Sequence, residues 1–383
     1  MNGFLNEREE NFFSSAYDET VELLRQLCAI PAPSHHEDAR AEFCRDWLRA
    51  NGAVEAYIDE AKNVVCPVCC DGAERISVLM AHMDTVFPDM EPMQLREEDG
   101  RLYCPGAGDD TANLAVMLMC AKYVLQSGLK PKNGRGFLFV CNSCEEGLGN
   151  LEGSRKIIEE YGERTAELVS FDGYWGGIVN AAVGSERYEV EVITEGGHSY
   201  SRFGNRNAIA VLASMISTLY DMKPPEGGRT TYNVGMISGG TSVNTIAAQA
   251  SMLYEYRSDC VESIDKMRRF FEGVVEAYRG MGVEINVRLL GRRPCAEGVD
   301  DAAQQELSRR AEKVICACTG LESVSLHAGS TDCNSSLAVG IPSVSFGVCL
   351  GDGAHTRGEW IELESLRLGL KLGAAWTLGY FDR

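Results

Sequence analysis

The sequence predicts an α/β protein whose mostly parallel sheet is interrupted in the chain by a smaller inserted domain. Short apolar runs alternate with helical patterns in the first and last parts of the chain, whereas the runs between residues 185 and 292 alternate polar and apolar residues. Continuous apolar strands are typical of a parallel sheet covered on both faces, and alternation is typical of a sheet with one exposed face. A chain of 383 residues is long enough for two domains. We therefore expect one domain made of residues 1–184 and 293–383, with residues 185–292 inserted into it.

Four apolar runs are the candidate strands of the larger domain, and they lie at residues 76–82, 136–142, 167–172 and 342–348. Between the first two runs lies a helical pattern whose apolar residues fall on one stripe. These residues are Leu114, Met117, Leu118, Ala121, Val124 and Leu125. Because strands and helices alternate in this order, the pattern predicts βαβ units and a largely parallel sheet.

An earlier helix is expected between residues 34 and 51. Phe43 and Trp47 lie on one face of it, and Asn51 with the glycine that follows ends it. Ser34 and Glu37 have the spacing of a capping box, in which two side chains satisfy the first free N–H groups of a helix. We therefore expect Ser34 to cap this helix.

The inserted segment has a different order of elements. Two helical patterns, in residues 207–222 and 264–275, alternate with four strand-like runs at residues 187–194, 231–237, 250–257 and 284–290. The resulting order βαββαβ is that of the ferredoxin-like split unit. We therefore expect a small antiparallel sheet covered by two helices.

The charge and the N-terminus exclude several classes of protein. The net charge of −20 argues against nucleic acid or an anionic membrane as a partner, since both require clustered Lys and Arg. The polar N-terminus has no apolar core of signal-peptide length, and no apolar run approaches the roughly 18 residues of a membrane span. We therefore expect a soluble cytoplasmic protein.

The 15 cysteines support a reducing compartment, because their number is odd and many lie inside apolar runs. An alternative is that the segment CPVCC at residues 66–70 begins a zinc site. However, no second Cys or His pair follows it at the spacing of a zinc finger. Buried free thiols are therefore the preferred interpretation.

Polar residues follow the apolar runs at five places along the chain. Each place alone has an ordinary structural explanation: an aspartate can cap a helix, and a histidine can satisfy a strand end. The carboxyl ends of parallel strands, however, meet at one edge of a sheet, so these side chains are expected to converge. The residues are His82 with Asp84, Asp109 with Asp110, the pair Glu145–Glu146, Asp172, and His355.

Two histidines and several carboxylates without a cysteine form a nitrogen and oxygen donor set, which suits zinc, with cobalt or manganese as alternatives. The carboxylates exceed what one ion uses, which favours two metal ions. Three ligand carboxylates and one hydroxide would neutralise the four positive charges of two divalent cations. Two metals about 3.5–4 Å apart can share a water and make it acidic enough to be hydroxide near neutral pH.

On these motifs the sequence resembles the dizinc exopeptidase and deacylase family of peptidase T, carboxypeptidase G, acetylornithine deacetylase and succinyl-diaminopimelate desuccinylase. The resemblance covers nearly the whole chain. It implies a mostly parallel-sheet dizinc-hydrolase catalytic domain with an inserted ferredoxin-like domain that serves as lid and dimerisation domain. It also implies two zinc ions, with Asp109 bridging both, His82 and Asp172 completing one ligand set, and Glu146 and His355 completing the other.

The resemblance also implies the roles of the residues that would act on the reacting groups. Glu145 resembles the general base, which takes a proton from the attacking water and returns it to the leaving amine. Asp84 resembles the aspartate that holds His82 by its other ring nitrogen. The sequence departs from the family pattern at Cys144, where an acid is usual, and at residues 111–113, where Lys-Gly-Gly is common. Cys144 is interpreted as a tolerated neutral substitution.

Six further residues are expected to contact substrate because they match the family pattern. Three lie in the inserted domain, where His198 resembles a histidine that reaches across a dimer into the partner's site. The alternative readings are a turn residue for His198, a strand-edge residue for Arg257, and a monomer whose own lid supplies His198. The six residues are His198, Asn244, Arg257, Gly329, Ser330 and Thr331.

Three functions remain open at this point. The first is a cytoplasmic dizinc metallopeptidase for small peptides, an aminopeptidase or dipeptidase similar to peptidase T. The resemblance implies that it acts as a homodimer through the inserted domain. The second is an N-acyl amino acid deacylase with the same chemistry. The third is a non-catalytic metal- or peptide-binding relative. The intact Glu145 argues against the third, because a binding protein needs metal ligands but no base.

Overall fold

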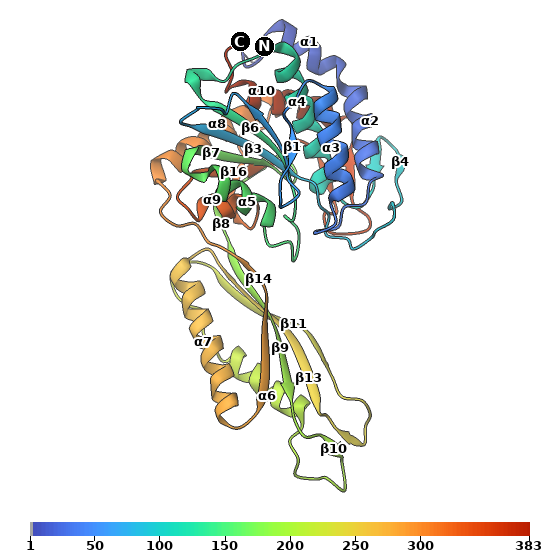
Figure 1. The fold of residues 1–383 in the computed structure, drawn as a ribbon, viewed down its shortest axis with the longest axis vertical. Coiled ribbons are helices and arrows are strands. Elements are labelled where there is room, and N and C mark those ends of the chain that lie inside the picture. Colours follow the sequence, from blue (N-terminus) through green and yellow to red (C-terminus); the bar gives the residue numbers. More distant parts are fainter. Residues whose placement is uncertain (1–2) are drawn as a thin grey trace. The chain divides into compact units, whose positions relative to one another are not determined.

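The structure is a computed structural model that describes residues 3–383 (Figure 1). The chain divides into two compact units. The larger contains the chain up to Ala182 and again from Glu297 onward, and the smaller contains Val183–Ala296. None of the helices in the described part of the chain is long and apolar enough to cross a membrane.

The larger unit is built on an eight-stranded sheet with the order β1-β2-β6-β3-β7-β16-β8-β15. The central strands β6, β3, β7 and β16 are mutually parallel, and so are β8 and β15, whereas β1, β2 and the contact between β16 and β8 are antiparallel. The prediction of a mostly parallel sheet is confirmed. The strands are β1 (Tyr57–Ile58), β2 (Val64–Val68), β3 (Ile76–His82), β6 (Gly136–Asn142), β7 (Thr165–Phe171), β8 (Gly177–Ala182), β15 (Ser325–Gly329) and β16 (Ser343–Phe346).

Helices cover this sheet, and every residue of β3 and β6 is buried, as their continuous apolar sequences predict. Helix α4 packs against α2, α10 and β3, whereas α5 packs against α9, which contacts β7, β8 and β16. The helices are α1 (Glu7–Ser15), α2 (Tyr17–Cys28), α3 (Asp38–Ala50), α4 (Ala112–Ser127), α5 (Glu152–Tyr161), α8 (Asp301–Thr319), α9 (Cys333–Leu337) and α10 (Ser365–Leu378).

The predicted capping box at the start of α3 is wrong. The residue that precedes the helix is Glu37, and no side chain caps the first turn. The Ser34 hydroxyl instead donates to Asp84 Oδ2 at 2.6 Å. The Ser34 hydroxyl therefore binds a carboxylate that is distant in sequence and does not bind the first turn of the helix.

A second, four-stranded antiparallel sheet was not predicted. Its order is β17-β18-β5-β4, and β18 pairs with β5 through residues such as Trp360 and Tyr103. The pairing joins the segment that leads to Asp109 to the segment that follows His355. The strands are β4 (Arg96–Glu98), β5 (Arg101–Tyr103), β17 (Gly351–Asp352) and β18 (Trp360–Glu362).

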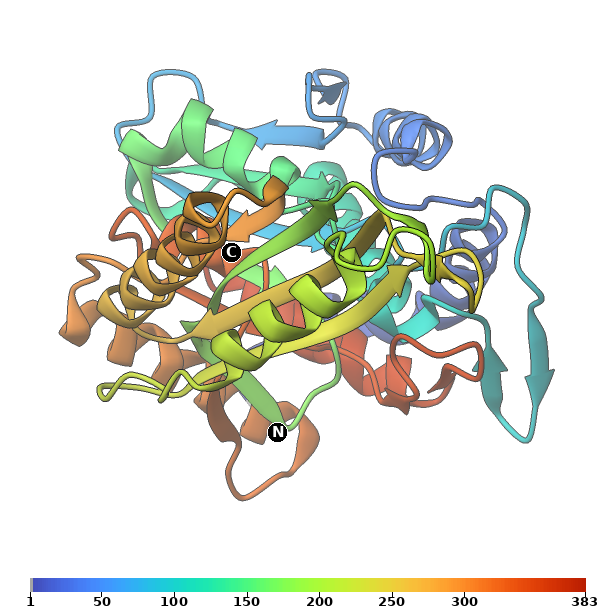
Figure 2. The same ribbon diagram turned by 90° about the horizontal axis from the view of Figure 1, so that it is seen from below.

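The smaller unit has a four-stranded antiparallel sheet with the order β11-β13-β9-β14. Two helices contact each other and pack on this sheet (Figures 1 and 2). The βαββαβ prediction is confirmed. The elements are β9 (Gly184–Ile193), α6 (Ala208–Tyr220), β11 (Thr230–Gly239), β13 (Gln249–Ser258), α7 (Val261–Gly280) and β14 (Glu284–Arg293), with a short ladder of β10 (Gly197–His198) and β12 (Thr245–Ile246).

Candidate metal centre

Three neighbouring parallel strands bring three of the five predicted ligands to one edge of the central sheet. His82 is the last residue of β3, Asp172 directly follows β7, and the pair Glu145–Glu146 follows β6 after two intervening residues. Because β6, β3 and β7 are adjacent and parallel, their carboxyl ends open onto the same region.

Asp109 lies between the two predicted histidine ligands. Its Oδ1 is 3.0 Å from Nε2 of His82, and its Oδ2 is 3.0 Å from Nε2 of His355. The same nitrogen of His355 is 3.2 Å from Oε1 of Glu146. The two oxygens of one carboxylate therefore face two different imidazoles.

The five predicted ligands form two groups that share one residue. One group contains His82, Asp109 and Asp172, and the other contains Asp109, Glu146 and His355; within each group the candidate ligand atoms lie within 4.8 Å of one another. Each group supplies nitrogen and oxygen atoms only, which suits zinc, cobalt or manganese. The shared position of Asp109 fits a pair of metal ions bridged by its carboxylate.

The pKa shifts of these groups indicate that positive charge stabilises the site. Burial opposes ionisation of Asp109, but hydrogen bonds from His355 and His82 outweigh burial and lower the pKa of Asp109. Contacts with Asp109 and Glu146 raise the pKa of His355 to about 11. Burial, together with the charge of Asp109, raises the pKa of Asp172 to about 7. Protonated histidines or bound divalent cations can supply the required charge.

The carboxylate of Glu359 holds the backbone on which Asp109 lies. It is fully buried and accepts the N–H groups of Gly106, Gly108 and Asp109 at 2.7, 2.7 and 2.8 Å. Burial raises the pKa of Glu359 to about 7. Sequence analysis did not single out Glu359. It lies four residues after His355 in the same loop motif, and this proximity was the sequence signal that could have identified it.

Asp84 positions the glutamate pair. Its Oδ1 accepts the backbone N–H of Glu145 and its Oδ2 accepts that of Glu146, both at 2.9 Å. Nδ1 of His82 is 3.0 Å from the backbone oxygen of Asp84 and 3.4 Å from the carboxylate oxygen Oδ1. The nearer partner of the imidazole is thus the main chain of Asp84, and the carboxylate serves mainly the pair and Ser34.

Asp110 serves the protein scaffold. Its carboxylate accepts the backbone N–H of His82 at 2.9 Å and an amide hydrogen of Asn113 at 2.6 Å. Asn113 also donates to the carbonyl of Gly173 and accepts the N–H of Val348. Neither Asp109 nor Asp110 caps α4, since Thr111 precedes that helix without a side-chain cap.

The loop with Gly329, Ser330 and Thr331 follows β15. Gly329 ends that strand, and the buried Thr331 donates its N–H to Oδ1 of Asn334 at 3.0 Å. The next residue, the buried Asp332, accepts an amide hydrogen of Asn142 at 2.5 Å. This contact ties the loop to the carboxyl end of β6. Sequence analysis did not single out Asp332.

The other expected substrate contacts lie in the smaller unit. His198 is in β10, and its Nδ1 accepts the N–H of Tyr200 at 3.3 Å. The backbone oxygen of Asn244 accepts the N–H of Ser199 at 2.9 Å, so His198 and Asn244 belong to one loop cluster. Arg257 lies on β13, an interior strand, and its guanidinium donates twice to Glu255. Arg257 is therefore not a residue of the sheet edge.

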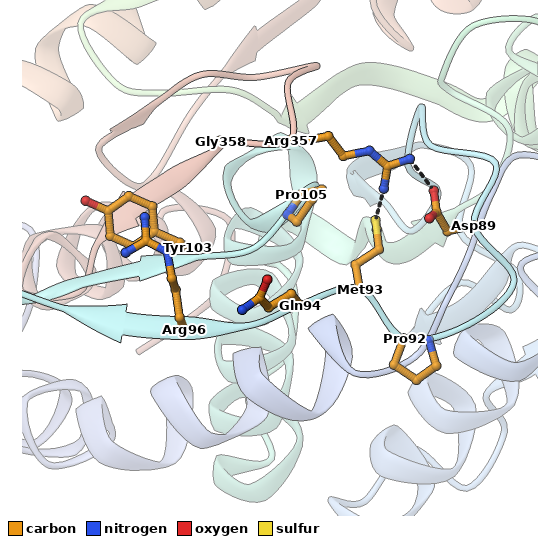
Figure 3. A pocket seen from close by; sticks show the side chains of 9 residues that line it. All are labelled: Asp89, Pro92, Met93, Gln94, Arg96, Tyr103, Pro105, Arg357 and Gly358. Carbon is orange, nitrogen blue, oxygen red and sulfur yellow. Dashed lines mark hydrogen bonds and ion pairs between the residues drawn. The ribbon is translucent and has the colours of Figure 1, made fainter.

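A surface hollow of about 350 Å³ lies beside the loop that carries His355 (Figure 3). Arg357 lines it and donates to Asp89 Oδ2 at 2.7 Å, while Arg96 stacks on the ring of Tyr103 at 3.6 Å. The guanidinium of Arg357 thus anchors the segment directly after His355 to the chain that follows β3.

Comparisons with known proteins place the chain in a family. The family model of Peptidase family M20/M25/M40 matches residues 78–378. A relative in Mycobacterium tuberculosis, provisionally named a succinyl-diaminopimelate desuccinylase, is 25% identical over 360 residues, which are 92% of this chain and 96% of the relative.

Two solved structures share the fold over most of their length. A tripeptidase from Staphylococcus aureus has a TM-score of 0.75 at 23% identity, with 94% of this chain and 97% of that chain covered. The aminopeptidase PepT from Bacillus cereus has a TM-score of 0.69 at 22% identity, with the same coverage.

The chain belongs to the M20/M25/M40 peptidase family. The family resemblance inferred from the sequence motifs is thereby confirmed, and so is the prediction that the chain is a hydrolase acting on amide bonds. Members of this family depend on two metal ions, and the two ligand groups around Asp109 are the candidate sites. The hypothesis of a non-catalytic binding relative is not supported.

Proposed function

We propose that the protein is a dizinc exopeptidase that hydrolyses the amide bonds of small peptides. The observation that carries this proposal is the position of Asp109, whose two carboxylate oxygens face His82 and His355 at 3.0 Å each. In this proposal Asp109 would be shared by two zinc ions, His82 and Asp172 would complete one ligand set, and Glu146 and His355 would complete the other.

When bound, the two metals would acidify a shared water and polarise the amide carbonyl. The carboxylate of Glu145 would accept the proton that the attacking water loses and would deliver it to the nitrogen of the leaving amine. Asp84 supports this role because it holds the backbone of Glu145 and Glu146 together. The side chain of Glu146 would serve as a metal ligand. The low exposure of Glu145, 7%, limits competition from bulk water.

The choice of peptide substrates draws on the family pattern around His198, Asn244 and Arg257. An arginine fork suits a free carboxylate, and small peptides and acylated amino acids both present one. The fold shared with a tripeptidase and an aminopeptidase supports the peptide reading. The relative named as a desuccinylase supports the alternative, an N-acyl amino acid deacylase.

A substrate panel distinguishes the two functions. The protein would be stripped of metal, loaded with zinc, cobalt or manganese, and assayed against di- and tripeptides with free or blocked N-termini and against N-acetyl and N-succinyl amino acids. Peptide cleavage that requires a free N-terminus is expected. Cleavage of the acyl amino acids alone would favour the deacylase, and no cleavage of either class would contradict the enzyme proposal.

We also propose a homodimer formed through the smaller unit. Strand β11 lies at the edge of its sheet, and Met236 and Ile237 on it are 57% and 59% exposed. An exposed edge strand with apolar side chains is suited to pairing with a second copy of itself. In this arrangement His198 would act in the site of the partner.

Subunit mixing tests this arrangement. Glu145→Gln and His198→Ala variants, each inactive alone, should recover activity when mixed, because a mixed dimer holds one site with an intact Glu145 and an intact partner histidine. No recovery, in mixtures shown to exchange subunits, would mean that His198 acts within its own chain, as in a monomer.

The cytoplasm is the proposed location. All 15 cysteines are free thiols, and most of them are buried. Unpaired thiols in this number suit a reducing compartment.

A further inference from the structure

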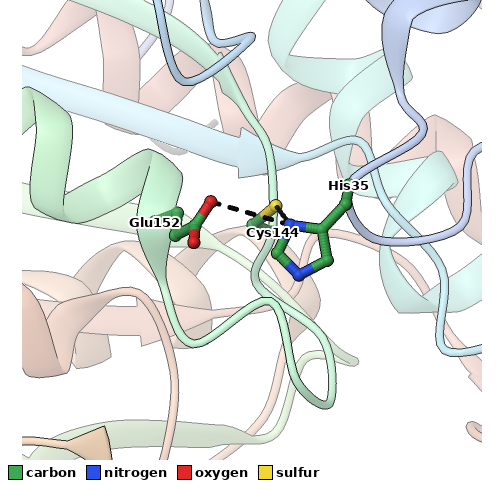
Figure 4. A group of neighbouring side chains, drawn as sticks. All are labelled: His35, Cys144 and Glu152. Carbon is green, nitrogen blue, oxygen red and sulfur yellow. Dashed lines mark hydrogen bonds and ion pairs between the residues drawn. The ribbon is translucent and has the colours of Figure 1, made fainter. Parts of the chain in front are cut away.

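Cys144, His35 and Glu152 form a second cluster of potential metal ligands, separate from the residues around Asp109 (Figure 4). Cys144 follows β6, His35 lies before α3, and Glu152 is the first residue of α5. The sulfur of Cys144 is 3.4 Å from Nδ1 of His35, and that nitrogen is 3.6 Å from Oε2 of Glu152. The segment that follows β6, the start of α5 and a loop more than 100 residues earlier thus direct one sulfur, one oxygen and one nitrogen toward each other.

The spacing of these atoms suits a small tetrahedral cation. Zinc binds nitrogen and oxygen at about 2.0–2.2 Å and sulfur at about 2.3 Å, so that neighbouring ligand atoms around it are about 3.3–3.7 Å apart. The two separations that involve Nδ1 of His35 lie in this range, and all three atoms lie within 4.8 Å of one another. A cation could therefore be bound with small side-chain movements.

The tautomer of His35 leaves the correct nitrogen available. Nε2 of His35 is 3.4 Å from the carbonyl oxygen of Leu148, and a carbonyl only accepts hydrogen bonds. In this contact Nε2 carries the hydrogen, and Nδ1 presents its lone pair toward Cys144. Histidine ligands of metals in proteins are commonly oriented by such a contact at the other ring nitrogen.

A buried carboxylate fixes the two residues that approach each other. Oε1 of Glu37 accepts the backbone N–H groups of His35 and Cys144, each at 3.0 Å, and is 3.3 Å from the sulfur of Cys144. Both residues have positive φ, 71° for His35 and 56° for Cys144, which is uncommon outside glycine and persists where the surroundings enforce it. Both loops are thus held by Glu37, which is not one of the ligands around Asp109.

The environment is negative and accessible. Glu37 and Glu152 place two carboxyl groups around one neutral thiol and one imidazole. Cys144 is 2% exposed, whereas the side chains of His35 and Glu152 are 48% and 59% exposed. A cation from solvent can therefore reach the sulfur from the side of His35 and Glu152.

We propose that Cys144, His35 and Glu152 form a third metal site that takes a thiophilic divalent cation such as zinc. On binding, the thiol releases its proton to solvent and the sulfur of Cys144 donates an electron pair to the cation. The lone pair of His35 Nδ1 and an oxygen of Glu152 supply two more bonds, and a water occupies the fourth position. Cys144, which departs from the family pattern, is then the residue that gives this chain its additional ion.

Cobalt is the probe that separates this site from the dinuclear centre. The ligands around Asp109 are nitrogen and oxygen atoms. Cobalt bound there should therefore show no thiolate-to-cobalt charge-transfer absorption in the near ultraviolet. The apoprotein titrated with cobalt should develop this absorption after the first two ions have bound. The metal content of the zinc-loaded protein should exceed that of Cys144→Ser by one ion per chain.

Matched variants make the test specific. Cys144→Ser should abolish the charge-transfer absorption, and His35→Asn, which retains a residue tolerant of positive φ, should weaken cobalt binding at least tenfold. Cys69→Ser, at an exposed cysteine outside the cluster, should change neither. Wild-type protein without the absorption at excess cobalt, or an absorption that survives in Cys144→Ser, would overturn the proposal. Since His35 is on the surface, its variant reports on the site even if Cys144→Ser folds poorly.

Discussion

The carboxylate of Asp84 accepts the backbone N–H of Glu146 at 2.9 Å, and its other oxygen accepts the N–H of Glu145 at the same distance. One buried aspartate therefore sets the positions of two adjacent glutamates through their main chain. Because these contacts use only the main chain of the pair, they allow the two side chains different tasks, as the proposed division between base and ligand requires.

Replacing Asp84 with Asn should lower kcat/KM roughly 10–100-fold, the usual effect of changing a group that orients metal ligands. An amide offers one accepting oxygen where the carboxylate offers two, so one backbone N–H of the pair would face an NH₂ group. Steady-state kinetics with metal analysis by mass spectrometry measures the effect. Ser34→Ala removes the hydroxyl contacts with Asp84 Oδ2 at 2.6 Å and with the backbone oxygen of Glu146 at 3.3 Å but leaves both oxygens of Asp84 in place, so it is the control and should have a smaller effect. Wild-type kinetics in Asp84→Asn would mean that the pair is positioned without it.

The two glutamates should respond differently to substitution. Glu145→Gln keeps the backbone contact with Asp84, so the geometry of the pair should persist while the proton acceptor is lost. We expect kcat to fall by roughly 10²–10⁴, the range of general-base catalysis, with metal content unchanged. Glu146→Gln should instead lower the metal content. The reverse pattern in metal analysis would exchange the roles of the two residues.

Glu359→Gln should weaken metal binding because Glu359 holds the backbone of Asp109. The amide would keep an acceptor for the N–H groups of Gly108 and Asp109 but would present an NH₂ group to the N–H of Gly106. We expect a roughly 10–100-fold loss of metal affinity, measured by competition with a chelator. Glu362→Gln, at an exposed position of β18, is the matched control. Equal affinities of the two variants would show that the Asp109 turn is held by other contacts.

The main sheet was predictable because its strands are continuous apolar runs bounded by turns. The second sheet was not, since β5 and β18 are only three residues long and pair across most of the chain. Short strands leave no periodicity, and their pairing depends on the tertiary position of their ends. Ser34 shows the same limit, because its hydroxyl donates to the distant carboxylate of Asp84 although the local sequence predicted a helix cap.

His82, Glu146 and Asp172 could be brought together from the sequence because parallel strands end together, whereas Asp109 follows β5 and His355 lies between β17 and β18, which belong to the second sheet. The backbone contacts that hold them could not be predicted. Asp84 was identified as a residue that holds His82, but its contacts with the N–H groups of the glutamate pair, like those of Glu359 with the turn at Asp109, have no sequence signature. Cys144 illustrates a further gap: its neighbours His35 and Glu37 lie more than 100 residues earlier, as the contacts show.

Glu186 in the smaller unit is fully buried and neutralised by Arg268 and Arg292, each with a nitrogen 2.6 Å from Oε1. Tyr188 donates to its Oε2 at 2.7 Å, and Tyr256 also donates to this oxygen. Burial opposes ionisation, but these partners outweigh burial and hold the pKa of Glu186 below its ordinary value near 4.5. The folded unit therefore binds fewer protons at this group than the unfolded chain does.

This linkage fixes the pH dependence of stability. The pKa of Glu186 is lower in the folded state than in the unfolded chain. The ionised carboxylate therefore contributes fully to the free energy of unfolding above pH about 4.5, and this contribution is lost as the pH falls through the lower, folded-state pKa. Glu186→Gln should reduce the free energy of unfolding by about 1–3 kcal/mol at neutral pH, the range for hydrogen bonds to charged groups. The difference from wild type, measured by urea unfolding, should shrink as the solution is acidified below pH about 4.

Glu189→Gln is the control, because Glu189 lies on the same strand and pairs with the exposed Arg288. It should lower the free energy of unfolding by less than about 1 kcal/mol at any pH. A difference for Glu186→Gln that stays constant down to acid pH would show that the carboxylate is not ionised in the folded unit.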